Sequence, residues 1–524
     1  MNPLLLLAIG LGIVVGGILW LRLHAFLALI LGAFVVGGLT SAEHMRASMQ
    51  AKYRGDMMRA AVKDGVAETV RKQKEAGQAF DVKAIGKDVR TQVSARQEEF
   101  DAQAKAKADS YVVSNTTLKR ITSAAGIAFG KIGLLIAMAC VIGRCLLASG
   151  AAERIVRSAL SIVGEKAAPV AFAGSAFLLG IPVFFDSLFL LGIPLVKAAW
   201  LKLRKNYLLL VMALVAGGTM THSLVPPTPG PLFVAEELGI NLGLMIIVGM
   251  AIGICSSASG LLFAAWLNRR YNIPLRETPE ALEKLEQLSK RDISELPSLT
   301  ISLVPILLPV VLIAGATIYK GGLDPSQAAP ALVNLLGDKN IALTISAAVA
   351  MLIAASRLKD RKAVADHVQD SMVEAGVIIL ICCGGGAFGA MLQQSGIGPY
   401  INSLTGDEPL DFGLLPVAFI VTAIIRGAQG SATVAMFTGV AIVGSITPDV
   451  SILSYHPVYL AVAIGCGSKP FPWMNDSGFW VVSKMSGITE AEMLKTQFPL
   501  LTVMGFSGIT VTLIAAKVFP MVGN

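Results

Sequence analysis

Residues 180–187 read Gly-Ile-Pro-Val-Phe-Phe-Asp-Ser and interrupt an apolar run that extends from 168 to 199. A second long apolar run, 412–446, is interrupted in the same way by Arg-Gly-Ala-Gln-Gly-Ser at 426–431. Non-helical backbone at membrane depth is tolerated only where protein or a wet cavity satisfies its polar groups. We therefore interpret each run as a re-entrant hairpin, in which two half-helices meet at a polar tip.

The chain as a whole has the composition of a membrane protein. Of its 524 residues, 54% are hydrophobic and only 15% are charged, whereas soluble domains are about a quarter charged. Ten further apolar stretches can span a bilayer, the shorter ones with their flanking residues: 3–21, 25–40, 124–148, 207–224, 241–267, 300–319, 341–356, 373–395, 456–482 and 498–519. The net charge of +8 forms no basic stripe interleaved with aromatic residues, so we expect no nucleic-acid partner.

An internal repeat underlies these segments. Five residues recur 246 positions further along the chain: Gly143, Leu146, Ser149, Gly150 and Ile155 correspond to Gly389, Leu392, Ser395, Gly396 and Ile401. Two more segments are broken, at 226–231 and at 467–476, and the order of helix, hairpin, broken helix and helix is the same in both halves. Five crossings per half would invert the second half relative to the first. The predicted fold is an all-α polytopic membrane protein of two inverted-topology repeats, each with a re-entrant hairpin and a broken transmembrane helix.

This pattern predicts six consecutive regions. They are scaffold helices of the first repeat (1–40), a polar helical extracytoplasmic insert (41–120), the transport core of the first repeat (121–270), a cytoplasmic linker (271–299), scaffold helices of the second repeat (300–370) and its transport core (371–524). The insert is interpreted either as a solvated structural cap or dimer contact, or as a module that docks a partner. The sequence leaves both interpretations open.

Charge predicts the orientation. Cationic residues gather where the first hairpin begins and ends: Arg154, Arg157, Lys166, Lys202, Arg204 and Lys205. The opposite side receives Glu236, Glu237 and the acidic stretch 406–411. Because cytoplasmic loops carry the excess of Lys and Arg, we expect a multi-pass protein of the bacterial inner (plasma) membrane with both termini extracytoplasmic.

Polar side chains at the four breaks are the candidate functional residues, because charges inside apolar segments are expensive. The candidate substrate-binding residues are Asp186, Ser187, Thr221, His222, Arg426, Gln429, Ser431, Thr433, Ser468, Lys469, Asn475, Asp476 and Ser477. Half-helix N-termini and cationic side chains suit an anion, and Ser, Thr and Asn can hydrogen-bond hydroxyl groups. The set predicts a small hydroxylated organic anion as ligand, with Asp186, His222 and Asp476 as proton-coupling groups. We expect no catalytic residue, metal or cofactor.

Simpler interpretations exist for several of these residues. Asp186 could be the N-cap of the second half-helix, and His222 could be a packing histidine. The run Gly384-Gly385-Gly386 lies inside an apolar segment without the lysine of a phosphate loop. We interpret it as a position of close helix packing.

Four ordered motifs carry a family resemblance: Ile181–Ser187, His222–Pro231, Arg426–Ala435 and Asn475–Trp480. In these motifs, and over most of 124–520, the chain resembles the gluconate permease family of sugar-acid:proton symporters, within the wider ion transporter superfamily. The resemblance implies a homodimeric carrier with a scaffold and a moving transport domain, which takes up aldonates such as gluconate with protons. Thr228 and Trp473 lie where members often carry histidine, and Lys469 and the insert also depart from the family pattern.

The leading hypothesis is therefore a secondary active symporter that imports a small organic anion with protons by alternating access. A sodium-coupled carboxylate transporter is one alternative. A membrane-embedded enzyme, or a sensor that uses the 41–120 insert, is another. Asp186 and Asp476 could imitate a catalytic pair. No second feature, such as a metal-binding HExxH motif, supports an enzymatic activity.

Overall fold

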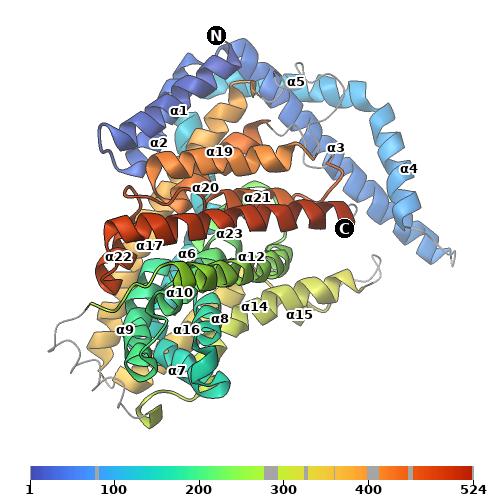
Figure 1. The fold of residues 1–524 in the computed structure, drawn as a ribbon. Helices are drawn as coiled ribbons and strands as arrows, with labels where there is room; N and C mark the ends of the chain where they lie inside the picture. The colour runs from blue at the N-terminus through green and yellow to red at the C-terminus, as the bar shows by residue number, and fades with distance from the viewer. Residues whose placement is uncertain are drawn as a thin grey trace.

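The computed structural model of the chain describes residues 2–76, 82–276, 293–323, 329–358, 360–397, 400, 412–446 and 453–521. The described residues form α-helices, two short 3-10 helices and connecting segments, without a strand among them (Figure 1). The predicted all-α polytopic architecture is confirmed. Most of the predicted linker, 277–292, and the acidic stretch 406–411 lie outside the described residues.

The helices of the first half follow the predicted order. They are α1 (Pro3–Leu19), α2 (Ala25–Leu39), α3 (Ala42–Glu75), α4 (Val82–Ala95), α5 (Gln97–Ser114), α6 (Thr117–Ala148), α7 (Ala151–Val163), η1 (Glu165–Ala167), α8 (Ala168–Leu179), α9 (Phe185–Leu203), α10 (Tyr207–Leu224), α11 (Pro229–Glu237) and α12 (Leu242–Arg270). The predicted hairpin at 168–199 is the pair α8 and α9. Because α8 has 12 residues, it is roughly 18 Å long and too short to cross a bilayer by itself.

The second half repeats this order of elements. Its helices are η2 (Ile293–Glu295), α14 (Leu299–Gly321), α15 (Ala331–Leu336), α16 (Lys339–Leu358), α17 (Arg361–Gln394), α19 (Leu414–Gln429), α20 (Ala432–Ile446), α21 (Val458–Gly467), α22 (Ser477–Ser486) and α23 (Glu490–Val518). The pair α19 and α20 corresponds to α8 and α9, and the broken pair α21 and α22 corresponds to α10 and α11. The inverted orientation of the two halves stays a prediction.

Within the described ranges, seven helices are long and apolar enough to cross a membrane: Thr117–Ala148, Tyr207–Glu237, Leu242–Arg270, Leu299–Gly321, Lys339–Leu358, Lys362–Gln394 and Glu490–Val518. Three of the ten predicted spans occur as shorter helices instead. The first two are α1 and α2, of 17 and 15 residues, and the third is the broken pair α21 and α22. At 1.5 Å per residue, helices of this length fall short of a bilayer about 30 Å thick.

Corresponding helices of the two halves pack on each other. Helix α6 packs along α17, and α12 packs along α23. A Cβ at Gly386 of α17 would lie 2.8 Å from the Cβ of Ala128 in α6, and one at Gly384 would lie 3.2 Å from the Cβ of Leu29. The interpretation of this glycine run as a close-packing position is confirmed, and the two halves form one interleaved core.

The polar insert forms three helices that extend to one side of the molecule (Figure 1). Helix α3 packs along α4 and α5 around a small apolar cluster that includes Val89 and Phe100. At its base, Arg120 of α6 is buried and donates to Gln394 Oε1 and to the Gly37 carbonyl oxygen, each at 2.9 Å. Gln394 Nε2 donates in turn to the Tyr111 hydroxyl at 3.2 Å. Tyr111 of α5 thus joins the insert to α17, and Arg120 joins α6 to α2 and α17 beneath it.

Candidate functional site

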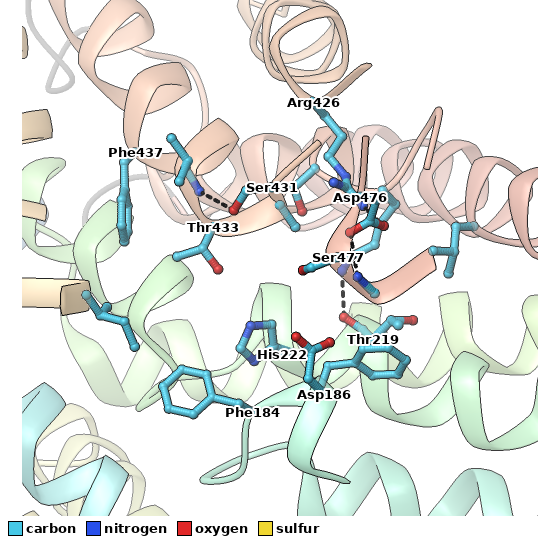
Figure 2. Close-up of a pocket in the computed structure, with 18 of the residues that line it drawn as sticks. Phe184, Asp186, Thr219, His222, Arg426, Ser431, Thr433, Phe437, Asp476 and Ser477 are labelled. Carbon is cyan, nitrogen blue, oxygen red and sulfur yellow. Dashed lines mark hydrogen bonds and ion pairs between the residues drawn. The ribbon is translucent and has the colours of Figure 1, made fainter. Parts of the chain in front are cut away.

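Both hairpin tips and the second helix break border one cavity of about 250 Å³, whereas the first broken helix contributes Thr219 and His222 from before its break at 226–231. Its polar lining comes from α9 and α10 on one side and from α19 to α23 on the other: Asp186, Thr219, His222, Arg426, Ser431, Thr433, Ser468, Lys469, Asp476, Ser477 and Gln497. Figure 2 shows Asp186 and His222 pointing from the first half toward Thr433, Ser477 and the Arg426–Asp476 pair of the second. Residues more than 200 positions apart therefore meet at one place.

The first hairpin tip presents a carboxylate without a local partner. Helix α8 ends at Leu179, and α9 begins at Phe185 with Phe184 as its N-cap and no side-chain capping bond. Asp186 lies in the first turn of α9, so the interpretation of Asp186 as the N-cap is wrong. Its carboxylate accepts no hydrogen bond from any residue that the structure describes. It borders the cavity instead, where a ligand or a proton can reach it.

The second hairpin and the second broken helix are joined by a buried ion pair. Arg426, in the last turn of α19, donates from Nη2 to Asp476 Oδ2 at 2.5 Å. Asp476 is the N-cap of α22 and also accepts from the Gly478 backbone N–H at 3.0 Å. Burying a charge is tolerated when it is paired in this way. Arg426 Nε and Nη1 have no partner among the described residues, so the guanidinium keeps donors for a further group.

A buried lysine joins the two halves across the cavity. Lys469, just beyond the end of α21, donates from Nζ to the Thr219 carbonyl oxygen of α10 at 2.6 Å. Its neighbour Ser468 donates to Ser223 Oγ at 3.0 Å. Because a carbonyl oxygen leaves the ammonium charge uncompensated, Lys469 makes the cavity more favourable for an anion.

His222 occupies the last turn of α10, opposite the first hairpin tip. Its ring is half-buried and packs edge-to-face on Phe184, with ring centroids 5.8 Å apart. Its Nδ1 has no partner among the described residues. His222 therefore packs against an aromatic ring and also lines the cavity, so both interpretations of this residue describe part of its surroundings.

The second hairpin tip is held by its backbone. Gly430 has φ of 85°, in the left-handed region that favours glycine, and a Cβ there would lie 3.0 Å from Asn475 Cγ. Asn475 Nδ2 donates to the carbonyl oxygens of Gly427 and Ala428 at 2.8 and 3.0 Å. Asn475 thus ties the 471–476 segment to the tip rather than facing the cavity.

Most of the predicted site residues line the cavity, but four do not. These are Ser187, Thr221, Gln429 and Asn475. Thr221 instead donates to the Gly217 carbonyl oxygen at 3.3 Å. Two polar lining residues, Thr219 and Gln497, were not predicted, nor was the apolar wall formed by Phe184, Phe185, Ile378, Ile381, Phe437 and Leu501. Phe184 and Phe185 belong to the first hairpin break, but only the polar residues there were selected, and the others lie within helices, where no Pro- or Gly-rich interruption marks them.

Comparison with known proteins gives one family and several relatives. The model of the GntP family permeases matches residues 111–518. An uncharacterized permease of Haemophilus influenzae is 33% identical over 76% of this chain and 83% of its own length. The inner membrane permease YgbN of Escherichia coli is 31% identical over 73% of this chain and 85% of its own. A gluconate permease of Pseudomonas aeruginosa is 31% identical over 74% and 85%.

Two solved structures are similar in fold. The YdaH transporter of Alcanivorax borkumensis, described as having an unusual topology, aligns with a TM-score of 0.55 at 14% identity, over 77% of this chain and 90% of that one. MtrF of Neisseria gonorrhoeae aligns with a TM-score of 0.54 at 15% identity, over 78% and 84%. At these identities the likeness concerns the fold alone.

Proposed function

Because the chain belongs to the GntP permease family, we propose that it is a symporter that imports gluconate or a related sugar acid together with protons. Membership places it among membrane transporters rather than enzymes. The proposed substrate class follows the names of relatives, which include gluconate permeases and an L-idonate transporter. The location we propose is the inner membrane, with both termini extracytoplasmic.

The observation that carries this proposal is the cavity where the breaks of both halves meet. A volume of about 250 Å³ is smaller than the pockets of drug-sized ligands, which favours a small metabolite. The unpartnered donors of Arg426 and the ammonium of Lys469 provide sites for a carboxylate. The hydroxyl groups of Ser431, Thr433 and Ser477 border the same space and can bind the hydroxyl groups of a sugar acid.

Charge balance favours protons as the coupling ion. The cavity holds two cationic side chains, Arg426 and Lys469, and two acidic ones, Asp186 and Asp476. With all four charged, their formal sum is zero, and a monocarboxylate would leave one uncompensated negative charge. Asp476 is held by Arg426, whereas Asp186 has no such cation. Protonation of Asp186 would restore neutrality when the anion binds. This step would couple the flux of protons to the flux of the substrate.

Transport would proceed by alternating access. The hairpin pairs α8–α9 and α19–α20 supply both tips of the cavity, so their movement would expose it first to one side and then to the other. Helices α1, α2, α14 and α16 would form the scaffold, which would also support a homodimer. Ion pairs that join Glu236 to Lys339 and Glu237 to Lys131 hold the end of α11 against α16 and α6.

The test is uptake by the purified protein in proteoliposomes. We expect labelled gluconate to accumulate when the outside is more acidic than the lumen, and a protonophore to abolish this accumulation. Galactonate, glycerate and citrate, each with and without sodium, define the substrate class. Accumulation that requires sodium and persists with the protonophore would show that sodium, rather than the proton, is the coupling ion. The absence of uptake of any sugar acid would refute the substrate class.

A further inference from the structure

One carboxylate within a membrane-spanning helix has no role in the cavity as described above. Glu374 lies in α17, inside the span Lys362–Gln394, and its side chain is half-buried. None of the described residues forms a hydrogen bond or an ion pair with it. An ionisable side chain at such a position is costly and is a functional candidate for that reason.

The position of Glu374 on its helix directs it along the wall of the cavity. Ile378 and Ile381 of α17 line the cavity, and they follow Glu374 by four and seven residues. Residues at these spacings share one face of a helix, and Glu374 lies roughly 6 Å along the axis from Ile378. Glu374 also interacts electrostatically with Asp186. Glu374 is therefore a further carboxylate near Asp186, beyond the residues that line the cavity.

Further ionisable groups continue toward the N-terminal end of α17. Arg144 of α6 donates to Asp370 Oδ2 at 2.7 Å, one turn before Glu374, and it also interacts electrostatically with Glu374. His367, two turns before Glu374, has an Nδ1 without a partner among the described residues. Cys140 of α6 also interacts electrostatically with Glu374. Asp370 is exposed and precedes the apolar stretch 373–395, so this series ends outside the apolar part of the helix.

We propose that Glu374 is a proton relay between the cavity and the N-terminal end of α17. Because the linker 271–299 is expected to be cytoplasmic, α14 and α16 would return the chain to that side before α17 begins at Arg361. The O–H bond of the Asp186 carboxyl group breaks, and the proton is bound by the Glu374 carboxylate, directly or through water. Glu374 then releases it to water beside Arg144 and Asp370 and returns to its charged form next to the Arg144 guanidinium. The inference rests on the proposed proton-coupled function and adds the exit route of the proton.

A comparison of net uptake with substrate exchange distinguishes a proton relay from a substrate-binding residue. Net uptake moves protons with the substrate, whereas exchange of labelled for unlabelled substrate across the membrane needs no net proton release. In proteoliposomes, we expect the pH-driven net uptake of labelled gluconate by Glu374→Gln to be at least tenfold slower than that of wild type. Gluconate exchange by the same variant should stay within about twofold of wild type. Glu374→Asp keeps a titratable group, so we expect it to retain pH-driven uptake.

Asp366→Asn is the matched control, because it removes an exposed carboxylate from the same helix, and we expect both modes to persist in it. Undiminished pH-driven uptake in Glu374→Gln would overturn the relay. Loss of exchange in both Glu374→Gln and Glu374→Asp would also overturn it, because Glu374 would then serve binding or movement. Wild-type uptake that ignores the pH gradient would instead refute the proposed function, and the relay with it.

Discussion

Asp186 and Asp476 border the same cavity but have opposite surroundings. Asp476 accepts from Arg426 and from the backbone N–H of Gly478, so its charge is matched and its position is fixed. Asp186 has no donor among the described residues. A carboxylate without a fixed cation can change its protonation state at small structural cost, while a paired one cannot. Substitution of Asp476 is therefore expected to affect stability, whereas substitution of Asp186 is expected to affect transport.

We predict that Asp476→Asn destabilises the protein and that Asp186→Asn does not. The first substitution leaves the buried Arg426 charge without its partner, at a cost of about 3–5 kcal/mol. The second removes an unpaired carboxylate and should leave the thermal unfolding midpoint in detergent close to that of wild type, while proton-driven uptake is lost. Equal midpoints for the two variants, or wild-type uptake by Asp186→Asn, would contradict this assignment.

The site residues that can be predicted from the sequence lie where the chain itself is interrupted. Pro and Gly mark the four breaks, and the polar residues beside them include Asp186, Arg426 and Lys469, which border the cavity. Thr219 and Gln497 lie within regular helices, and only the packing of α10 and α23 brings them there. The bond from Lys469 to the Thr219 carbonyl oxygen joins the two halves, and nothing in the local sequence indicates it.

At the scale of helices, small residues decide how closely the two halves approach. Helix α17 crosses α6 where Gly386 faces Ala128. Association of helices in lipid depends on such close backbone contact rather than on the hydrophobic effect. Elsewhere on α17, Gly376 has open space around the position of a Cβ, so the same helix offers an internal control.

We predict that Gly386→Val destabilises the protein and that Gly376→Ala does not. The added side chain at 386 would collide with Ala128 of α6 and separate the helices, at a cost of about 1–3 kcal/mol. Gly376→Ala meets no atom within 4 Å and should be neutral or slightly stabilising, since alanine favours helix. Thermal unfolding of the two variants in detergent measures the difference, and a reversed order would contradict the packing described for this crossing.

The order of helices could be predicted because apolar length and Pro- or Gly-rich breaks are local features. The lengths of several helices could not. Helix α6 begins at Thr117 and α17 begins at Arg361, well before the apolar stretches 124–148 and 373–395. The additional turn of α6 carries Arg120, whose bonds to Gln394 and to the Gly37 carbonyl oxygen join distant parts of the chain, which a local pattern does not contain.

At the scale of the whole molecule, the insert leaves and rejoins the membrane core at one point. The Thr117 hydroxyl at the start of α6 donates to the Gly37 carbonyl oxygen near the end of α2, at 3.5 Å. Arg120 donates to the same oxygen. The core is therefore closed beneath the insert, and α3 to α5 form an attachment to it rather than a bridge within it.

We predict that replacing residues 42–114 with a short Gly-Ser linker preserves transport. The deletion removes the bonds from Gln394 to Tyr111 and from Ser48 to the Gln393 carbonyl oxygen, each worth about 1 kcal/mol, so the unfolding midpoint should fall modestly. Arg120 and Thr117 stay in place. Loss of uptake by a folded deletion variant would show that the insert takes part in transport, as a sensor or partner-docking module would.

The proposed transport of an anion requires that the two hairpin tips, the second helix break and the end of α10 converge on the ligand. A density map of the full-length protein in lipid nanodiscs with saturating gluconate tests this most directly. We expect one ligand density per chain between Asp186 and Arg426, with its carboxylate within hydrogen-bond distance of the Arg426 guanidinium or the Lys469 ammonium. An empty cavity together with ligand density elsewhere in the chain, in a preparation that transports gluconate, would show that this cavity is not the substrate site.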